Sequence, residues 1–506
     1  MKRLAQPVKS NLIIQYFALV LLSVLSFSTV ADQSSTFVSR QPDGIVGAVC
    51  VIRNGDNLIL LSEVITNKLS LPGGYIDKGD TPEQAAAREA LEETGIEVGV
   101  EHLIQYRGRA AIFACKATSP ILVSSFKDHR GYPIVASWFA KHYATEVERV
   151  YLIDPSAIEA GDYRYVEDAA LLPLWLAQTP ESEINIYERF AYPGSTLLKV
   201  QLGWIEQFQH HVSTWPASLQ WLFEGMMHGV SVVGEPCFAF IMVVIVAGYL
   251  RTPLLLEVVF LFVAALFGAS LFKHGLMMPR PYFIVPELQQ VNAYGFGFPS
   301  VHILMSTLLL GVWGFLWQGK LPLAWQKAGL ATVIMLLVLT QGIARVWFGV
   351  QFISDVILSL MLSFALVAMF IVWRTGGFPY FQLQLTNHWF WLGSSVLIGM
   401  VASLSLVPQQ AYLFAFVLGC SLAVAPALQV SQLTPALSRC RKVVASVMVL
   451  LGASILYSTA SMLATMQTGS LVVLAIKAMG YLMLGAWLVY GSAWVRGLLS
   501  RLRVRF

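Results

Sequence analysis

The sequence is poor in charged residues. They make up only 12% of its 506 residues, whereas hydrophobic residues make up 56%. Soluble domains carry about a quarter charged residues, so this composition excludes a wholly soluble chain and indicates a membrane protein. The charge is also uneven, because nearly all acidic residues precede about Glu224 and long apolar runs follow. The chain therefore divides into a polar first half and an apolar second half.

The sequence also lacks long runs of lysine or arginine. Its formal net charge is only +4, so nucleic acid is excluded as a partner. The five cysteines are irregularly spaced and match neither a zinc site nor a framework of several disulfides. Cys50 and Cys115 lie in two strand-like stretches of the polar half. Two buried thiols are the favoured interpretation, and one disulfide is the alternative if this half is exported.

Residues 1–31 have the pattern of a secretory signal peptide. Basic residues precede an apolar stretch over residues 12–30, and small residues at 29–31 suit a signal peptidase. The alternative is an uncleaved anchor helix, because the apolar stretch is long for a signal peptide. In either case Asp32 emerges outside the membrane.

Apolar segments of about twenty residues, the length that crosses a bilayer, fill the second half. We predict nine spans, at residues 233–250, 255–272, 300–317, 327–344, 352–373, 389–406, 412–428, 443–466 and 471–490. The four spans within residues 387–491 carry no recognisable motif. Residues 200–232, which are rich in aromatic side chains, are expected to form an interfacial helix or a plain linker.

Basic residues gather in alternate loops between these spans. The loops that would be cytoplasmic, if the polar half is outside, contain Arg251, Lys320, Lys327, Arg374, Arg439, Arg441 and Lys442. Residues 492–506 add four arginines as a basic tail. The positive-inside rule therefore predicts a multi-pass protein of the inner (cell) membrane, with its polar half outside and its C-terminus in the cytoplasm.

Three carboxylates follow a glycine-rich turn at residues 71–80. Residues 81–95 have the capping signals of a helix, on which Glu89, Glu92 and Glu93 share one face. Such crowding is costly without a cation. A hard divalent ion, Mg²⁺ or Mn²⁺, would neutralise these carboxylates and bridge them to a phosphate group. A solvated acidic face is the alternative, which the adjacent glycines and arginine disfavour.

The residues around these acids resemble the Nudix box. Gly74, Asp80 and the run Arg88-Glu-Ala-Leu-Glu-Glu-Thr-Gly-Ile96 match it, with Asp80 in the place of a glutamate. The resemblance implies an α/β Nudix fold, a mixed sheet with helices, over residues 44–178. It implies a diphosphate hydrolase in which Glu89, Glu92 and Glu93 are catalytic, with Glu89 either binding the metal or acting as the general base for the attacking water.

The same resemblance assigns the metal ligands and a binding residue. Glu89, Glu92, Glu93 and Gly74 are expected to bind the metal, and Arg88 is expected to bind substrate and to fix Glu92. The family's substrates carry a nucleoside or another group on a diphosphate, and this sequence does not identify that group.

A second set of residues forms an anion site at the outer membrane surface. Lys273, Arg280 and Arg345 offer donors for a phosphate group, and His302, after Ser300, can protonate a leaving oxygen. Each residue alone would be an interfacial anchor. Their order and spacing resemble the motifs of the type 2 phosphatidic acid phosphatase family, over residues 222–374, and a membrane domain of this type is predicted for residues 233–374.

This second resemblance implies hydrolysis of a lipid phosphate without a metal, with Lys273, Arg280, Ser300 and Arg345 binding substrate. His302 and Asp355 would be catalytic. Gln351 stands where the family has its nucleophilic histidine, four residues before Asp355. A carboxamide has no basic lone pair, so the phosphohistidine route is closed at this position.

Together these observations predict a membrane-bound bifunctional hydrolase acting on phosphorus-containing anhydrides. We expect an α/β Nudix fold followed by an all-α polytopic membrane domain of about nine spans. Mg²⁺ or Mn²⁺ would serve the first domain, and membrane lipids and a diphosphate substrate, such as undecaprenyl diphosphate, would be its partners. In the alternative interpretation the membrane half is a non-catalytic lipid-binding anchor, and Gln351 in the place of the nucleophilic histidine indicates the missing activity. A purely structural protein is a third interpretation, which the intact carboxylates disfavour.

Overall fold

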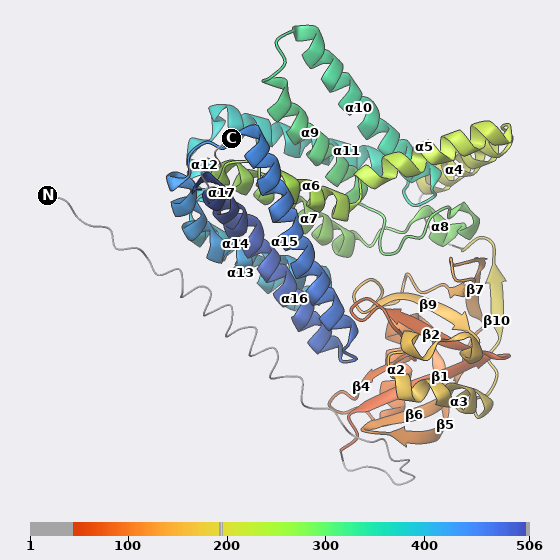
Figure 1. The fold of residues 1–506 in the computed structure, drawn as a ribbon. Coiled ribbons are helices and arrows are strands. Elements are labelled where there is room, and N and C mark those ends of the chain that lie inside the picture. The colour runs from red at the N-terminus through yellow and green to blue at the C-terminus, as the bar shows by residue number, and fades with distance from the viewer. Residues whose placement is uncertain (1–43, 192–193, 195, 502–506) are drawn as a thin grey trace.

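The computed structural model describes residues 44–191, 194 and 196–501. Figure 1 shows the strands gathered in one domain, next to a larger array of helices. The predicted signal peptide or anchor, residues 1–31, lies outside the described residues.

The first domain is built on a mixed sheet with the strand order β10-β7-β8-β9-β2-β1-β6-β5. β1 pairs with β6 in parallel and with β2 in antiparallel orientation, while β3 and β4 pair with β2 and β1. The strands are β1 (Gly47–Asn54), β2 (Asn57–Glu63), β3 (Leu69–Ser70), β4 (Gly73–Tyr75), β5 (Val98–Arg107), β6 (Ala110–Ala117), β7 (Ile121–Lys127), β8 (Pro133–Val135), β9 (Val147–Ile153) and β10 (Ile184–Tyr187). The helices of this domain are α2 (Pro82–Thr94), η1 (Pro155–Ala157), η2 (Ala160–Asp162), η3 (Val166–Leu171) and α3 (Leu172–Ala177). The predicted mixed sheet with helices is confirmed.

The central strands are buried on both faces, because helices cover both sides of the sheet. Ile52 of β1 packs in the same buried cluster as Ala90 of α2. The adjacent Val51 faces the other side of the sheet, and it packs in the buried cluster that contains Trp175 of α3. Alternate side chains of a strand point to opposite faces, so one apolar run supplies both layers. This packing fixes α2, which carries the predicted metal ligands, against the sheet.

Cys50 of β1 and Cys115 of β6 form a disulfide bond. The two strands are neighbours, and the Cα atoms of the cysteines lie 5.6 Å apart. The favoured prediction of two buried free thiols is therefore wrong, and the alternative is right. The sequence pattern placed both residues on strands, but the pairing of strands 65 residues apart depends on the whole sheet.

The second half of the chain is all helical. Its elements are α4 (Thr196–Ser213), α5 (Ala217–Val233), α6 (Pro236–Ala247), α7 (Thr252–Leu276), α8 (Pro281–Ile284), η4 (Pro286–Leu288), α9 (Val301–Gln318), α10 (Ala324–Trp347), α11 (Ile353–Val372), η5 (Trp373–Gly377), α12 (Pro379–Leu385), α13 (His388–Ser405), α14 (Pro408–Leu433), α15 (Arg439–Thr465), α16 (Ser470–Ala486), η6 (Trp487–Gly491) and α17 (Ser492–Arg501). Within the described residues, eight helices are long and apolar enough to span a membrane. The bent pair α5 and α6 gives a ninth span if it is counted as one. The prediction of a polytopic all-α domain is confirmed.

The bent pair and the last helix show where local structure departs from simple spans. α5 and α6 meet at an angle of 53°. The segment predicted to be a basic tail is helical through Arg501. Its Arg496 is buried and donates hydrogen bonds to the Ala247 carbonyl (3.0 Å) and the Thr252 hydroxyl (2.9 Å). This guanidinium therefore ties α17 to the turn between α6 and α7.

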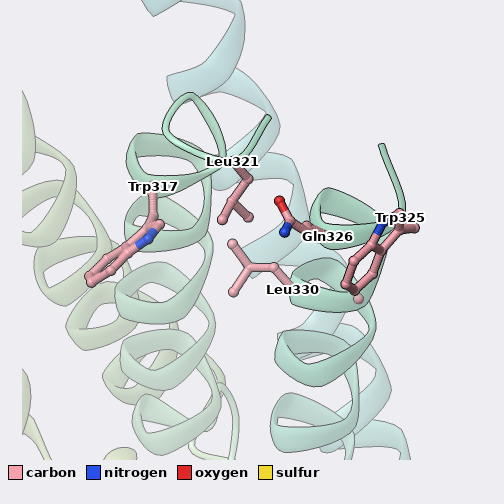
Figure 2. A pocket seen from close by; sticks show the side chains of 6 residues that line it. Trp317, Leu321, Trp325, Gln326 and Leu330 are labelled. Carbon is pink, nitrogen blue, oxygen red and sulfur yellow. The ribbon is translucent and has the colours of Figure 1, made fainter. Parts of the chain in front are cut away.

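An apolar cleft opens at the turn between α9 and α10. Figure 2 shows Trp317, Leu321, Trp325, Gln326 and Leu330 around it. The cleft lies at the C-terminal end of α9, whereas the predicted catalytic His302 lies at the N-terminal end of the same 18-residue helix. A helix of this length is about 27 Å long, so the cleft is remote from the predicted phosphate site.

Among the described residues, hydrogen bonds join the two halves of the chain in two regions. At the first, the Gly295 amide donates a hydrogen bond of 3.0 Å to the Tyr143 hydroxyl, and Arg149 donates to the Ala293 carbonyl. At the second, Lys477 of α16 donates to the Ile65 carbonyl at 2.6 Å. The first contact involves the loop between Arg280 and Ser300, and the second involves the last spans.

The disulfide gives a direct test by counting thiols. We expect the denatured protein to react with three equivalents of a maleimide before reduction, at Cys237, Cys420 and Cys440, and with five after it. Mass spectrometry gives the count. A Cys50→Ser control frees Cys115 and should show four without reductant. Five reactive thiols in the unreduced protein would exclude the bond.

Candidate metal and phosphate sites

The helix α2 begins and ends as the sequence predicts. The Thr81 hydroxyl accepts a hydrogen bond from the Gln84 amide, and the Gln84 side chain accepts one from the Thr81 amide. Gly95 ends the helix in the left-handed conformation, with φ 74°. These caps satisfy backbone groups that would otherwise be unpaired, and they fix where each glutamate points.

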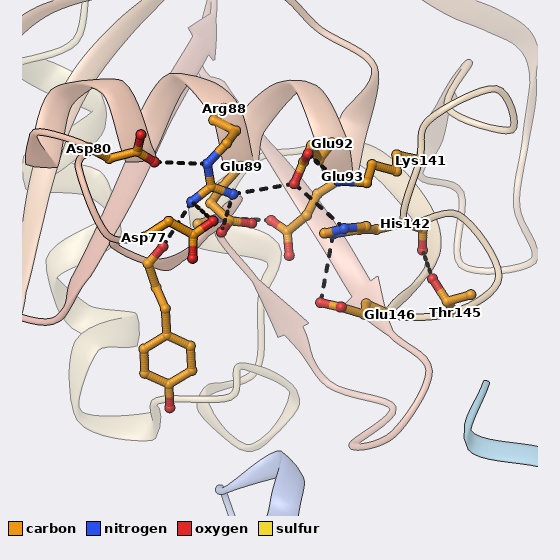
Figure 3. A network of polar contacts seen from close by, with 12 residues as sticks. Asp77, Asp80, Arg88, Glu89, Glu92, Glu93, Lys141, His142, Thr145 and Glu146 are labelled. Carbon is orange, nitrogen blue, oxygen red and sulfur yellow. Dashed lines mark hydrogen bonds and ion pairs between the residues drawn. The ribbon is translucent and has the colours of Figure 1, made fainter. Parts of the chain in front are cut away.

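Arg88 lies at the centre of the carboxylates in Figure 3. Its guanidinium donates to Asp80 at 3.0 Å, to Glu89 at 2.9 Å and to Glu92 at 3.3 Å, and it donates to the Tyr75 carbonyl at 2.9 Å. Asp80 thus forms the local ion pair although it is shorter than a glutamate. The arginine fixes three carboxylates from two segments in one geometry.

Glu93 is the most enclosed of the three glutamates. Its carboxylate accepts a hydrogen bond of 2.8 Å from the Gly73 amide. Burial raises the pKa of Glu93 well above its ordinary range, and the neighbouring Glu89 adds to this effect. Burial also raises the pKa of Glu89. Two carboxyl groups that are hard to ionise side by side are a place where a bound cation lowers the free energy of the charged state.

The position of Gly74 requires a residue without a side chain. A Cβ atom there would lie 2.5 to 2.8 Å from the carboxylate atoms of Glu89. The backbone of β4 therefore approaches the carboxylate closely, as the sequence predicts for a carbonyl that shares a metal with it.

Lys141 and His142 complete the site and were not found from the sequence. Lys141 donates to one oxygen of Glu92, and the Nε2 atom of His142 lies 3.6 Å from the other. Burial acts to raise the pKa of Glu92, but Lys141, His142 and Arg88 lower it overall. The two residues come from the segment before β9, about fifty positions after the box, and no sequence pattern links them to it.

The donors present fit a divalent cation. Glu89, Glu92 and His142 each place one ligand atom within 4.8 Å of the others. Carboxylate oxygens are the ligands that Mg²⁺ and Mn²⁺ prefer. Glu93 adds a buried carboxylate behind this group. The structure thus brings two of the predicted ligands, Glu89 and Glu92, together with His142, which the sequence did not reveal, as a candidate metal site.

The predicted phosphate ligands of the membrane half bind backbone carbonyls instead. Arg280 donates to the carbonyls of Gly295 (2.6 Å), Tyr294 (3.0 Å) and Val350 (3.0 Å). Lys273 donates to the Phe296 carbonyl at 2.6 Å. These cations hold the loop before Ser300 in place. Lys273 and Arg280 both contact this loop, and the sequence could not show that its carbonyls accept their hydrogen bonds.

His302 and Arg345 contact the end of α5 and the turn after it. The Nε2 atom of His302 lies 2.9 Å from a carboxylate oxygen of Glu235, and Arg345 donates to the Ser231 hydroxyl at 3.3 Å. Glu235 was not identified from the sequence, because it lies outside the motifs. The Ser300 hydroxyl and the Nε atom of Arg345 are buried without a hydrogen-bond partner among the described residues. Buried polar atoms of this kind indicate a ligand or water.

Gln351 and Asp355 do not interact as a catalytic pair. Gln351 donates through its amide to the Gly297 carbonyl at 3.0 Å. Asp355 accepts from the Phe352 amide at 3.2 Å and caps α11. Both side chains are buried. The acid that would orient a histidine at position 351 is therefore used as a helix cap.

Comparisons with known proteins match both halves. Residues 44–147 match the NUDIX domain, and residues 254–378 match the PAP2 superfamily. The predicted combination of a Nudix domain and a lipid-phosphatase-type membrane domain is confirmed. These matches support the predicted enzyme class, a hydrolase of phosphorus-containing anhydrides or esters.

Individual relatives cover parts of the chain. An 8-oxo-dGTP diphosphatase of Escherichia coli (strain K12) is 48% identical over 54 residues, which are 10% of this chain and 42% of that protein. A MutT-like protein of Streptomyces ambofaciens is 35% identical over 14% of this chain and 50% of that protein. The chain thus spans about half the length of these curated relatives. A transmembrane PAP2 type phosphatidylglycerolphosphate phosphatase from Bacillus subtilis is 18% identical, with a TM-score of 0.27, over 35% of this chain and 96% of that structure.

The close approach of Gly74 to Glu89 can be tested with the metal alone. We expect Gly74→Ala to weaken Mn²⁺ binding by about 10-fold to 100-fold, because the new methyl group displaces the Glu89 carboxylate. Calorimetric titration of the purified chain measures the affinity. The matched control is Gly99→Ala on β5, where the nearest atom to the new Cβ lies 4.0 Å away. Equal affinity in the two variants would show that Gly74 does not shape the metal site.

Proposed function

Because the chain joins a Nudix domain to a PAP2-type membrane domain, we propose that it is a membrane-bound hydrolase that cleaves a diphosphate outside the inner membrane. The observation that carries this proposal is the carboxylate cluster on α2, held by Arg88 and closed by Gly74. A chance acidic helix face has neither a central arginine nor a glycine cradle.

The residues of this site have separate roles in the proposed reaction. Glu89, Glu92 and Glu93, with His142 and the Gly74 carbonyl, would hold Mg²⁺ or Mn²⁺. When bound, such an ion supplies charge that stabilises the diphosphate oxygens and lowers the pKa of bound water. Glu89 lies beside Gly74 and Arg88, and we assign it the proton from the attacking water as well as a place among the metal ligands. Arg88 fixes Glu89 and Glu92 and offers charge toward the substrate.

An outside location is supported by two independent features. Basic residues mark alternate loops as cytoplasmic, and the Cys50–Cys115 disulfide suits an oxidising compartment. Free nucleotides are scarce there. We therefore propose a diphosphate linked to a lipid, such as undecaprenyl diphosphate, in preference to the nucleotide named for the relative from Escherichia coli.

Contacts between the halves support a lipid-linked substrate. The Ile65 carbonyl accepts from Lys477, which lies seven residues into the span α16. Seven residues of helix correspond to about 10 Å, so in the proposed topology this loop of the Nudix domain would lie near the membrane surface. A diphosphate on a membrane lipid would therefore lie close to both the Nudix domain and the PAP2-type domain, which in this proposal binds or hydrolyses the lipid phosphate.

A second candidate function follows from Gln351. Its amide is bonded to Gly297 and offers no basic nitrogen, so the membrane half would be a non-catalytic lipid-binding anchor for an active Nudix domain. The double variant Glu92→Gln, Glu93→Gln separates the two functions. Phosphate release from a lipid diphosphate by this variant supports two active sites, and its complete loss supports the anchor.

We expect Glu93→Gln to lower Mg²⁺-dependent diphosphate cleavage by about 100-fold or more, because it removes a charge from the cluster that holds the metal. A screen with 8-oxo-dGTP and undecaprenyl diphosphate, with Mg²⁺ and with chelator, measures this loss. Glu97→Gln is the matched control, since Glu97 is exposed just beyond α2. Full activity in chelator would refute the metal requirement.

The proposed orientation is tested with a reporter enzyme that is active only after export. A fusion after Phe506 should stay inactive, because the arginine-rich C-terminus is cytoplasmic by the positive-inside rule. A fusion after Gln467, between α15 and α16, should be active. An active reporter at Phe506 would reverse the topology and remove the argument for a lipid-linked substrate.

A further inference from the structure

The contact between Glu235 and His302 has no counterpart among the motifs that the sequence revealed. His302 lies in the first turn of α9, and Glu235 lies in the short break between α5 and α6. Their side chains meet at 2.9 Å, between a carboxylate oxygen and the Nε2 atom of the imidazole. The bond engages Nε2 and leaves Nδ1 as the nitrogen that can accept a proton. A carboxylate on one nitrogen makes the other a better base.

Close packing positions this pair. A Cβ atom on Gly234 would lie 2.2 Å from the Gln341 side chain and 2.8 Å from the His302 carbonyl. The break before α6 therefore packs closely against the start of α9 and against α10. This packing places the next residue, Glu235, beside the imidazole of His302. Three elements thus place Glu235 beside the imidazole, with the Glu235 side chain 51% exposed.

Arg345, a predicted phosphate ligand, lies beside the same end of α5. Arg345 bonds to Ser231, one helical turn before Glu235, and its Nε atom is buried without a partner among the described residues. Both side-chain polar atoms of Gln341, one turn before Arg345 on α10, are also buried and unpaired in the described structure. Of these atoms, Arg345 Nε and Gln341 Nε2 are donors that can serve an anion next to His302, whereas Lys273 and Arg280 are bound to carbonyls.

We propose that Glu235 positions His302 for acid–base catalysis of lipid phosphate hydrolysis by water, a route that needs no nucleophilic histidine at position 351. His302 acts as the base and Glu235 is its positioning residue. This inference rests on the proposed function only in that the membrane half binds a lipid phosphate.

The step needs no reactant other than water. Nδ1 of His302 takes a proton from a water molecule as the water oxygen forms a bond to phosphorus. The bond between phosphorus and the lipid oxygen breaks, and the imidazolium returns the proton to that oxygen. The products are inorganic phosphate and the lipid alcohol. Arg345 holds the phosphate oxygens, and Glu235 stabilises the imidazolium.

The test uses phosphatidic acid in detergent micelles with chelator and the full-length protein. This probe contains no diphosphate and the buffer no metal, so the Nudix site cannot contribute. We expect slow phosphate release by the wild type and its loss in His302→Ala. Glu235→Gln should lower kcat by about 100-fold while KM changes less than about threefold. Glu235→Asp should restore part of kcat, because the carboxylate is retained.

Glu224→Gln, an exposed acid on α5, is the matched control and should behave as the wild type. Thermal unfolding in detergent shows whether each variant is folded. Three results would overturn the inference: no release above the His302→Ala background, release that appears only in Gln351→His, or a Glu235→Gln variant changed in KM alone. Binding of phosphatidic acid without release would retain the lipid site and reject the pair.

Discussion

Buried cations need hydrogen-bond acceptors, and this requirement organises the boundary between the two halves. A guanidinium removed from water is costly unless its donors are satisfied. Arg280 is 6% exposed and takes three backbone carbonyls, two of them from Tyr294 and Gly295. Because its acceptors come from backbone, the arginine dictates the path of this loop. The same loop then offers the Gly295 amide to Tyr143 of the Nudix domain. One buried charge therefore shapes the membrane site and the interface together.

The Nudix domain needs positive counter-charges, since it must hold several negative charges close together. Arg88 is the permanent counter-ion, and it reaches carboxylates on α2 and on the preceding turn. His142 links the carboxylate cluster to the contact with the membrane half. Its amide donates to the Glu92 carbonyl at the end of α2, and the next residue, Tyr143, meets the membrane half. The segment before β9 thus supplies His142 to the candidate metal site and Tyr143 to the contact with the membrane half.

Sequence reasoning succeeded where the chemistry is local. The caps of α2 and the spacing of its glutamates lie within fifteen residues, so pattern alone fixed them. It failed where partners come from distant segments. His142 reaches Glu92 across 50 positions and Glu235 reaches His302 across 67, with no spacing rule to join them. Cys50 and Cys115 were placed on strands, but only the parallel pairing of β1 with β6 brings their sulfurs together.

Gln351 shows both what a local sequence pattern reveals and what only the contacts between distant segments reveal. The sequence shows the loss of a basic nitrogen, and the structure shows what the amide does in its place. It donates to the Gly297 carbonyl, in the loop that Arg280 and Lys273 also hold. A neutral amide can make this bond at any pH, whereas an imidazole in the same position would have to use one nitrogen for it. Position 351 therefore contributes to the rigidity of the loop. His302 bonds to Glu235 and not to this loop, so it is the imidazole to which we assign the acid–base chemistry of this half.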